Sequence, residues 1–70
     1  MPRSIDVIVE VNGHLSRRTL ERGSTAADLL QLLDLLPDAN IVVKDKIPVP
    51  ITQALKDGDR IHIIKVASGG

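Results

Sequence analysis

The chain contains no cysteine and no aromatic residue, and these two absences remove several classes of function. Without cysteine there are no disulfides, no thiolate metal sites and no cysteine nucleophile. Without Phe, Tyr or Trp there is no ring on which a base or a sugar can stack, which disfavours single-stranded nucleic-acid and lectin-like binding. Leu, Ile, Val and Met are the only large apolar side chains left to build a core.

Net charge is absent as well, because nine Lys and Arg balance nine Asp and Glu. No net field therefore draws in nucleic acid or an anionic membrane. No apolar run is long enough to span a bilayer, and the first residues lack the apolar core of a signal peptide. Seventy residues make one domain, near the lower size limit for a single unstapled core. We expect a compact, soluble, cytoplasmic domain with no nucleic-acid or membrane partner.

An alternating stretch near the start predicts a strand, with one face formed by Ile5, Val7, Val9 and Val11. Asn12-Gly13 follows and predicts a hairpin turn, because both residues accept positive φ. The return strand, about 15–20, is more polar and suits a sheet edge, where charge discourages pairing with other chains. Arg17 and Arg18 are interpreted as part of this solvated edge. The loop has two or three residues, so the register stays open.

One helix is predicted from Ala26 to about Leu36. Thr25 and Asp28 have the spacing of a capping box at its start. An apolar stripe at spacings of three and four is formed by Ala26, Leu29, Leu30, Leu33 and Leu36. Pro37 is expected to end the helix.

The second half of the chain predicts further strands. Residues 41–43 read as a short strand, and the two prolines within 47–50 confine that segment to an edge. Residues 57–59, Asp-Gly-Asp, are interpreted as a tight turn before the last strand and not as an acid–base pair. One helix can cover only one face of a sheet. The predicted fold is therefore α+β, a β-grasp mixed sheet of four to five strands with one main helix on one face, its first and last strands parallel at the centre.

The end of the sequence is the most unusual stretch, because the last strand runs directly into Ala-Ser-Gly-Gly. With glycine at about 7% of residues, a pair in the last two places arises by chance in about 0.5% of chains. We expect residues 1–66 to form the β-grasp domain and residues 67–70 to form a flexible C-terminal tail whose carboxylate is the working group. A frayed terminus of no function is the alternative.

Taken together, these features resemble the ubiquitin-like sulfur carriers. The resemblance covers nearly the whole chain and rests on the hairpin, the capped Leu-rich helix, Val49-Pro50, the run Leu55-x-Asp57-Gly58-Asp59-x-Ile61-x-Ile63 and the final Gly69-Gly70. This superfamily includes the thiamine-biosynthesis carrier ThiS, the molybdopterin-synthase subunit MoaD and the archaeal small ubiquitin-like modifiers.

The resemblance implies a carrier protein and not an enzyme. A ThiF/MoeB-like, E1-like adenylyltransferase would use ATP and Mg²⁺ to adenylate the carboxylate of Gly70. Sulfur transfer would then give a thiocarboxylate, whose sulfur passes to a downstream enzyme of thiamine, molybdopterin or tRNA thiolation. Gly69, having no Cβ, would let the tail enter a narrow channel. No cofactor or metal would be bound by the chain itself. Conjugation of the same carboxyl group to protein lysines, or a plain β-grasp interaction domain, are the alternatives.

A candidate docking face for these partners is predicted on the side of the sheet away from the helix. It consists of Ile8, His62, Ile64 and Val66, with Ser68 beyond them. Clustered exposed apolar residues often mark contact surfaces, although scattered apolar residues on a small sheet are an equal alternative. His14 is expected to be exposed beside the hairpin turn, and neither histidine has a second ligand at metal-binding spacing.

Overall fold

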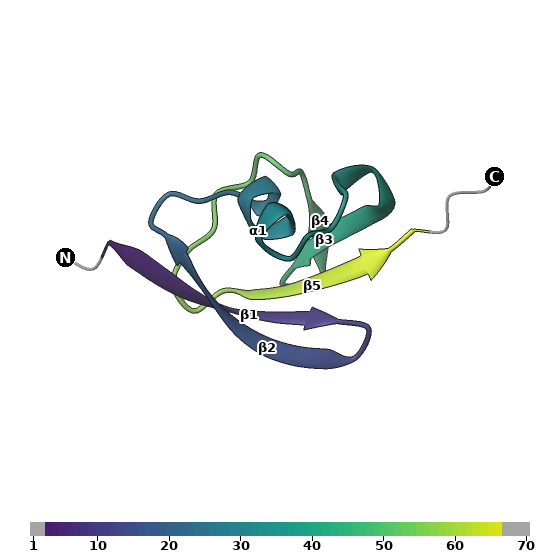
Figure 1. Cartoon of the computed structure of the whole chain (residues 1–70). Helices are drawn as coiled ribbons and strands as arrows, with labels where there is room; N and C mark the ends of the chain where they lie inside the picture. The colour runs from purple at the N-terminus through teal and green to yellow at the C-terminus, as the bar shows by residue number, and fades with distance from the viewer. Residues whose placement is uncertain (1–2, 67–70) are drawn as a thin grey trace.

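A computed structural model describes residues 3–66, which form a five-stranded mixed sheet with one α-helix across one face (Figure 1). The elements are β1 (Ser4–Val11), β2 (His14–Glu21), α1 (Ala26–Leu32), a 3-10 turn η1 (Pro37–Ala39), β3 (Asn40–Lys44), β4 (Ile47–Val49) and β5 (Arg60–Lys65). The strand order is β2-β1-β5-β3-β4, with β1 and β5 parallel and the other neighbours antiparallel. This is the predicted β-grasp fold, and β1 and β5 lie at its centre.

The first hairpin settles the register that the sequence left open. Val11 pairs with His14, so the loop is the two residues Asn12 and Gly13. Their φ angles are +52° and +79°, which is the left-handed pair that a type I′ turn requires. β2 pairs with β1 on one side and lies at the edge of the sheet, as predicted.

The helix begins where the sequence predicted and ends earlier. Its capping box is present: the Thr25 amide donates to Asp28 Oδ2 at 2.8 Å, and the Asp28 amide donates to Thr25 Oγ1 at 3.4 Å. These bonds satisfy backbone donors that have no partner inside the first turn. The predicted end at Leu36 is wrong, because α1 stops at Leu32 and Leu33 is its C-cap.

The reason for the early stop is Asp34, whose φ of +59° turns the chain out of the helix. Its amide donates to the Gln31 carbonyl oxygen at 3.1 Å, and the Leu35 amide donates to that of Leu30 at 2.8 Å. These two bonds form a Schellman motif, here with aspartate in place of the usual glycine. Leu35 therefore packs against the core, and Leu36 is 70% exposed.

The core lies between α1 and the facing side of the sheet. Its buried side chains are Ile5, Val7, Val9, Leu20, Ala26, Leu29, Leu30, Val42, Leu55, Ile61 and Ile63. Each large aliphatic side chain contributes about 1.5–3 kcal/mol by leaving water. The alternation of β1 and β5 produces this arrangement. Ile5, Val7, Val9, Ile61 and Ile63 are buried against the helix, and the even-numbered residues lie on the opposite, open face.

The turn before β5 uses its carboxylates to hold backbone. Asp57 Oδ1 accepts from the Asp6 amide at 2.8 Å, and Asp59 Oδ2 accepts from the Lys56 amide at 2.7 Å. Asp59 Oδ2 also lies 3.2 Å from Lys44 Nζ. Both aspartates therefore fix the start of the central strand, in agreement with the turn predicted from the sequence.

Candidate functional site

The central strand β5 leads the chain toward its C-terminal residues. Ile61 and Ile63 are buried beneath α1, and the Val66 amide donates to the Ala39 carbonyl oxygen at 2.8 Å. The last described residue, Val66, is thus tied to η1, the 3-10 turn that precedes β3. The candidate residues Ser68, Gly69 and Gly70, and the predicted tail 67–70, lie outside the described residues.

The open face of the sheet is ordered in rows by the strand register. In one row Ile8 of β1 lies between Arg17 of β2 and Arg60 of β5. A second row, one pleat further along β1, consists of Leu15, Glu10, His62 and Val43. A third pairs Ile41 with Ile64, which are 42% and 44% exposed.

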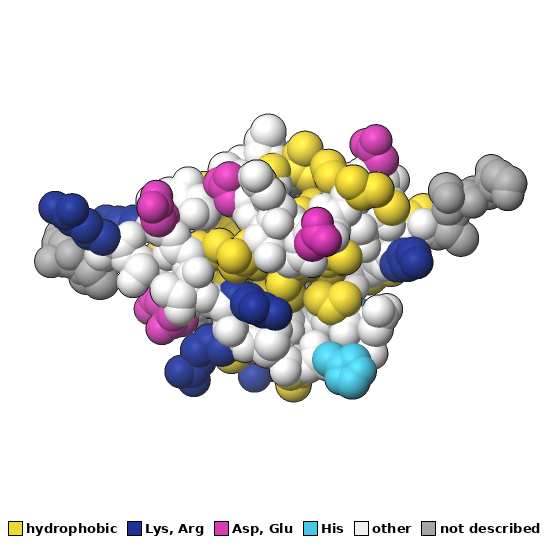
Figure 2. Space-filling view, viewed as in Figure 1, with side chains coloured by type: hydrophobic (Ala, Val, Ile, Leu, Met, Phe, Trp, Pro, Cys, Tyr) yellow, Lys and Arg dark blue, Asp and Glu magenta, His cyan; other side chains and the backbone are white. Residues whose placement is uncertain are grey.

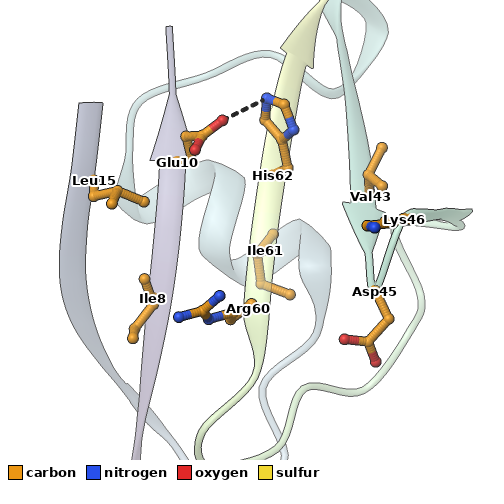
Figure 3. A pocket seen from close by; sticks show the side chains of 9 residues that line it. All are labelled: Ile8, Glu10, Leu15, Val43, Asp45, Lys46, Arg60, Ile61 and His62. Atoms are coloured by element: carbon orange, nitrogen blue, oxygen red, sulfur yellow. Dashed lines mark ion pairs between the residues drawn. The ribbon is translucent and has the colours of Figure 1, made fainter. Parts of the chain in front are cut away.

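An ion pair crosses the two central strands of this face. His62 Nε2 lies 3.2 Å from Glu10 Oε2, with the side chains 49% and 39% exposed (Figure 3). The carboxylate thereby orients the imidazole toward β1, across the two central strands. The sequence identified His62 but missed Glu10. Only the parallel pairing of β1 with β5 brings them together, and no local pattern signals that register.

A shallow hollow surrounds this pair (Figure 3). It is lined by Ile8, Glu10, Leu15, Val43, Asp45, Lys46, Arg60, Ile61 and His62. The predicted docking residues therefore divide in two. Ile8 and His62 line the hollow, whereas Ile64 lies one row further toward the end of β5, and Val66, 39% exposed, follows it.

The side chains around the hollow offer both apolar and charged contacts to a binding partner. Apolar atoms of Ile8, Val43 and Leu15 offer contact area, and Arg60 reaches from β5 toward Ile8 in Figure 3. Among residues 3–66 no group of His, Asp and Glu is arranged to hold a metal ion. His14 is exposed at the hairpin, as predicted. None of the helices in the described chain has the length and apolarity to cross a membrane.

The fold defines the class of protein first: this is a ubiquitin-like β-grasp domain. The chain has a TM-score of 0.76 to the solution structure of the N-terminal ubiquitin-like domain in the 4931431F19Rik protein, at 16% identity, covering 100% of this chain and 82% of that one. It has a TM-score of 0.68 to the crystal structure of SAMP1 from Haloferax volcanii, at 17% identity, covering 96% and 99%. At these identities the likeness shows the fold alone.

The sequence comparisons then give the family. Residues 5–67 match the family described as small archaeal modifier protein 2, so the chain belongs to that family of ubiquitin-like modifiers and carriers. An uncharacterised protein of Archaeoglobus fulgidus is 34% identical over 65 residues, which span 93% of this chain and 81% of that protein. The resemblance to the ubiquitin-like sulfur carriers and archaeal modifiers is thereby confirmed.

Proposed function

We propose that this protein is a carrier whose Gly70 carboxyl group is activated by an E1-like enzyme and converted to a thiocarboxylate. The observation that carries the proposal is the family match, which covers residues 5–67. The Gly69-Gly70 pair lies just beyond the matched residues, after β5.

The chemistry would take place in the partner enzyme. A Gly70 carboxylate oxygen attacks the α-phosphorus of Mg²⁺-bound ATP, and pyrophosphate leaves. A hydrosulfide ion then attacks the acyl carbon of the adenylate, AMP leaves with the bonding electron pair, and loss of the sulfur-bound proton gives the thiocarboxylate. A carboxylate is a poor electrophile, so the adenylate supplies the leaving group that the exchange of oxygen for sulfur needs.

The open face is the surface on which the activating enzyme would dock. It lies on β5, the strand that leads to the glycines, so docking there would aim the tail at a nearby channel. The apolar side chains Ile8, Ile64 and Val66 supply contact area, and the half-exposed Glu10–His62 pair supplies orientation. Aromatic anchors are absent, so affinity would rest on these aliphatic contacts and on charge.

An ATP–pyrophosphate exchange assay tests the activation step. The purified chain ending at Gly70 is incubated with an archaeal E1-like enzyme, ATP, Mg²⁺ and labelled pyrophosphate. We expect label to enter ATP only when the chain is present, and this exchange to be lost when Gly70 is deleted. The truncated protein is the matched control, because it keeps all described residues. Equal exchange with the truncated protein would exclude activation at Gly70.

Conjugation to lysines is the second candidate, because the matched family is described as a modifier. The same activated carboxyl group would then form an isopeptide bond with a lysine Nζ of a target, and AMP or an enzyme thiol would leave. Digestion of such conjugates leaves a Gly-Gly remnant on the target lysine. Finding that remnant, and its loss on deletion of Gly70, would support the modifier function beside or in place of sulfur transfer.

A further inference from the structure

The two edges of the sheet differ in their ability to accept another strand. β4 is three residues long, and Pro48 in its middle has no backbone N–H to donate. β2 is eight residues long, contains no proline and pairs with β1 in one unbroken register from His14 to Glu21. A long regular edge strand is a template for a further strand. Only β2 of these two edges offers such a template.

The register identifies which backbone groups of β2 point outward. In a two-residue hairpin the closing pair, Val11 and His14, exchanges both backbone hydrogen bonds, and every second pair after it does the same. The Arg22 amide, which donates to the Arg3 carbonyl oxygen at 2.8 Å, keeps this alternation to the end of the hairpin. The residues between these pairs, Leu15, Arg17 and Thr19, therefore direct their N–H and C=O groups away from β1.

Arg17 and Arg18 stand in the middle of this edge, one on each face of the sheet. Both are exposed, and within residues 3–66 neither forms an ion pair. Dark blue Lys and Arg side chains lie along the lower margin of Figure 2, where Figure 1 places β2. Adjacent strand residues point to opposite faces, so an added strand meets one guanidinium above the sheet and one below it.

The same two arginines oppose pairing of β2 with another copy of itself. Among the antiparallel registers in which the outward-directed backbone groups of both copies meet, the two that overlap the strands most fully place Arg17 opposite Arg17, or Arg18 opposite Arg18. Like charges directly opposite each other destabilise a strand pair, and opposite charges stabilise it. The edge thus selects against a second copy and in favour of a strand that carries carboxylates at its centre.

We propose that the β2 edge binds an extended, acidic segment of a partner protein as a sixth strand. The backbone of the segment pairs with Leu15, Arg17 and Thr19. Two successive Asp or Glu residues of the segment reach Arg17 and Arg18 on the two faces. A neighbouring apolar residue covers Leu15, which is 70% exposed. This interaction uses no atom of the C-terminal glycines, so it stands or falls independently of carboxyl activation.

The test is a titration of the isotope-labelled full chain with the acetylated and amidated peptide Val-Thr-Val-Glu-Glu-Val-Thr-Val, followed by NMR. Its matched control replaces the two glutamates by lysines. Because Ser16 and Arg18 already donate to β1, we expect slowed amide-proton exchange at Leu15, Arg17 and Thr19 and unchanged exchange at Ser16 and Arg18. The lysine peptide is expected to bind about tenfold more weakly or worse, since two ion pairs become two repulsions.

Charge reversal completes the test. The double variant Arg17→Glu/Arg18→Glu changes two residues of an exposed edge and keeps every core contact. We therefore expect its amide spectrum to be unchanged outside β2, which would show that the variant folds. It is expected to prefer the lysine peptide over the glutamate peptide. Three results would each overturn the proposal. The first is equal affinity for the two peptides, and the second is a set of spectral changes confined to the open face around Ile8 and His62. The third is unchanged amide exchange at millimolar peptide.

Discussion

Glu10 and His62 face each other on adjacent parallel strands, and His62 Nε2 lies 3.2 Å from Glu10 Oε2 in the middle of the open face. The pair joins the strand that follows the N-terminus to the strand that leads toward the glycines. Both side chains are partly solvated, so their interaction is screened and weak. We expect the pair to contribute mainly by orienting the imidazole of His62 on a binding surface.

The first prediction separates the contribution of the Glu10–His62 pair to stability from its contribution to binding. Glu10→Gln should change the free energy of unfolding by less than about 1 kcal/mol, because exposed ion pairs contribute little. It should nevertheless weaken binding of the E1-like enzyme, measured by titration calorimetry, because His62 loses the group that holds it. A variant that unfolds more readily but binds its enzyme normally would assign the pair to stability alone.

The apolar part of the open face gives the second prediction. Ile64→Asp should reduce affinity for the activating enzyme about tenfold or more, because a charge would be buried in the interface. Leu36→Asp is the matched control, since Leu36 is more exposed, at 70% against 44%, and lies outside the sheet, at the N-cap of η1. Equal affinities for the two variants would remove Ile64 from the docking surface.

The core gives the third prediction. Leu29 is fully buried, and Leu29→Ala should lower the free energy of unfolding by about 2–5 kcal/mol. A domain of this size has a small free energy of unfolding. The variant is therefore expected to have a much lower melting temperature than the parent or to be largely unfolded. Leu33→Ala should cost less, because Leu33 packs only partly buried at the helix C-cap. Thermal melts followed by circular dichroism measure both.

Two hairpin turns of the same type supply the fourth prediction. Asp45 and Lys46 have φ angles of +52° and +67°, which repeat the left-handed pair at Asn12 and Gly13. Lysine is strained in this conformation, and Lys46→Gly should therefore raise the free energy of unfolding by about 0.5–1 kcal/mol. Gly13→Lys is the reverse substitution in the other hairpin, and it should lower the free energy of unfolding by a similar amount. A destabilised Lys46→Gly protein would show that the lysine side chain makes a compensating contact.

Much of this fold follows from short patterns that the tertiary structure does not override. The alternation of 5–11, the Asn12-Gly13 turn and the Thr25–Asp28 capping box each specify a local geometry, and all three are present. The end of the helix was mispredicted because Asp34 has no strong propensity to stop a helix. Its left-handed conformation is stabilised by Schellman bonds and by burial of Leu35, which exist only once the core is formed.

The candidate site was predictable to a similar extent. Alternation along the last strand placed His62 and Ile64 on the open face, where the structure has them. Glu10, Val43 and Arg60 were missed because they join the site through the pairing of strands far apart in sequence. The docking role of Ile8, His62, Ile64 and Val66 stays a prediction.

The central claim, that the Gly70 carboxyl group is the reactive group, is tested most directly by intact-protein mass spectrometry. The chain ending at Gly70 is incubated with an E1-like enzyme, ATP, Mg²⁺ and a hydrosulfide donor, and then fragmented. We predict a mass gain equal to the replacement of one oxygen atom by sulfur, located on the C-terminal glycine. An unchanged mass under conditions in which the enzyme activates its own known substrate, or sulfur located elsewhere in the chain, would contradict the account.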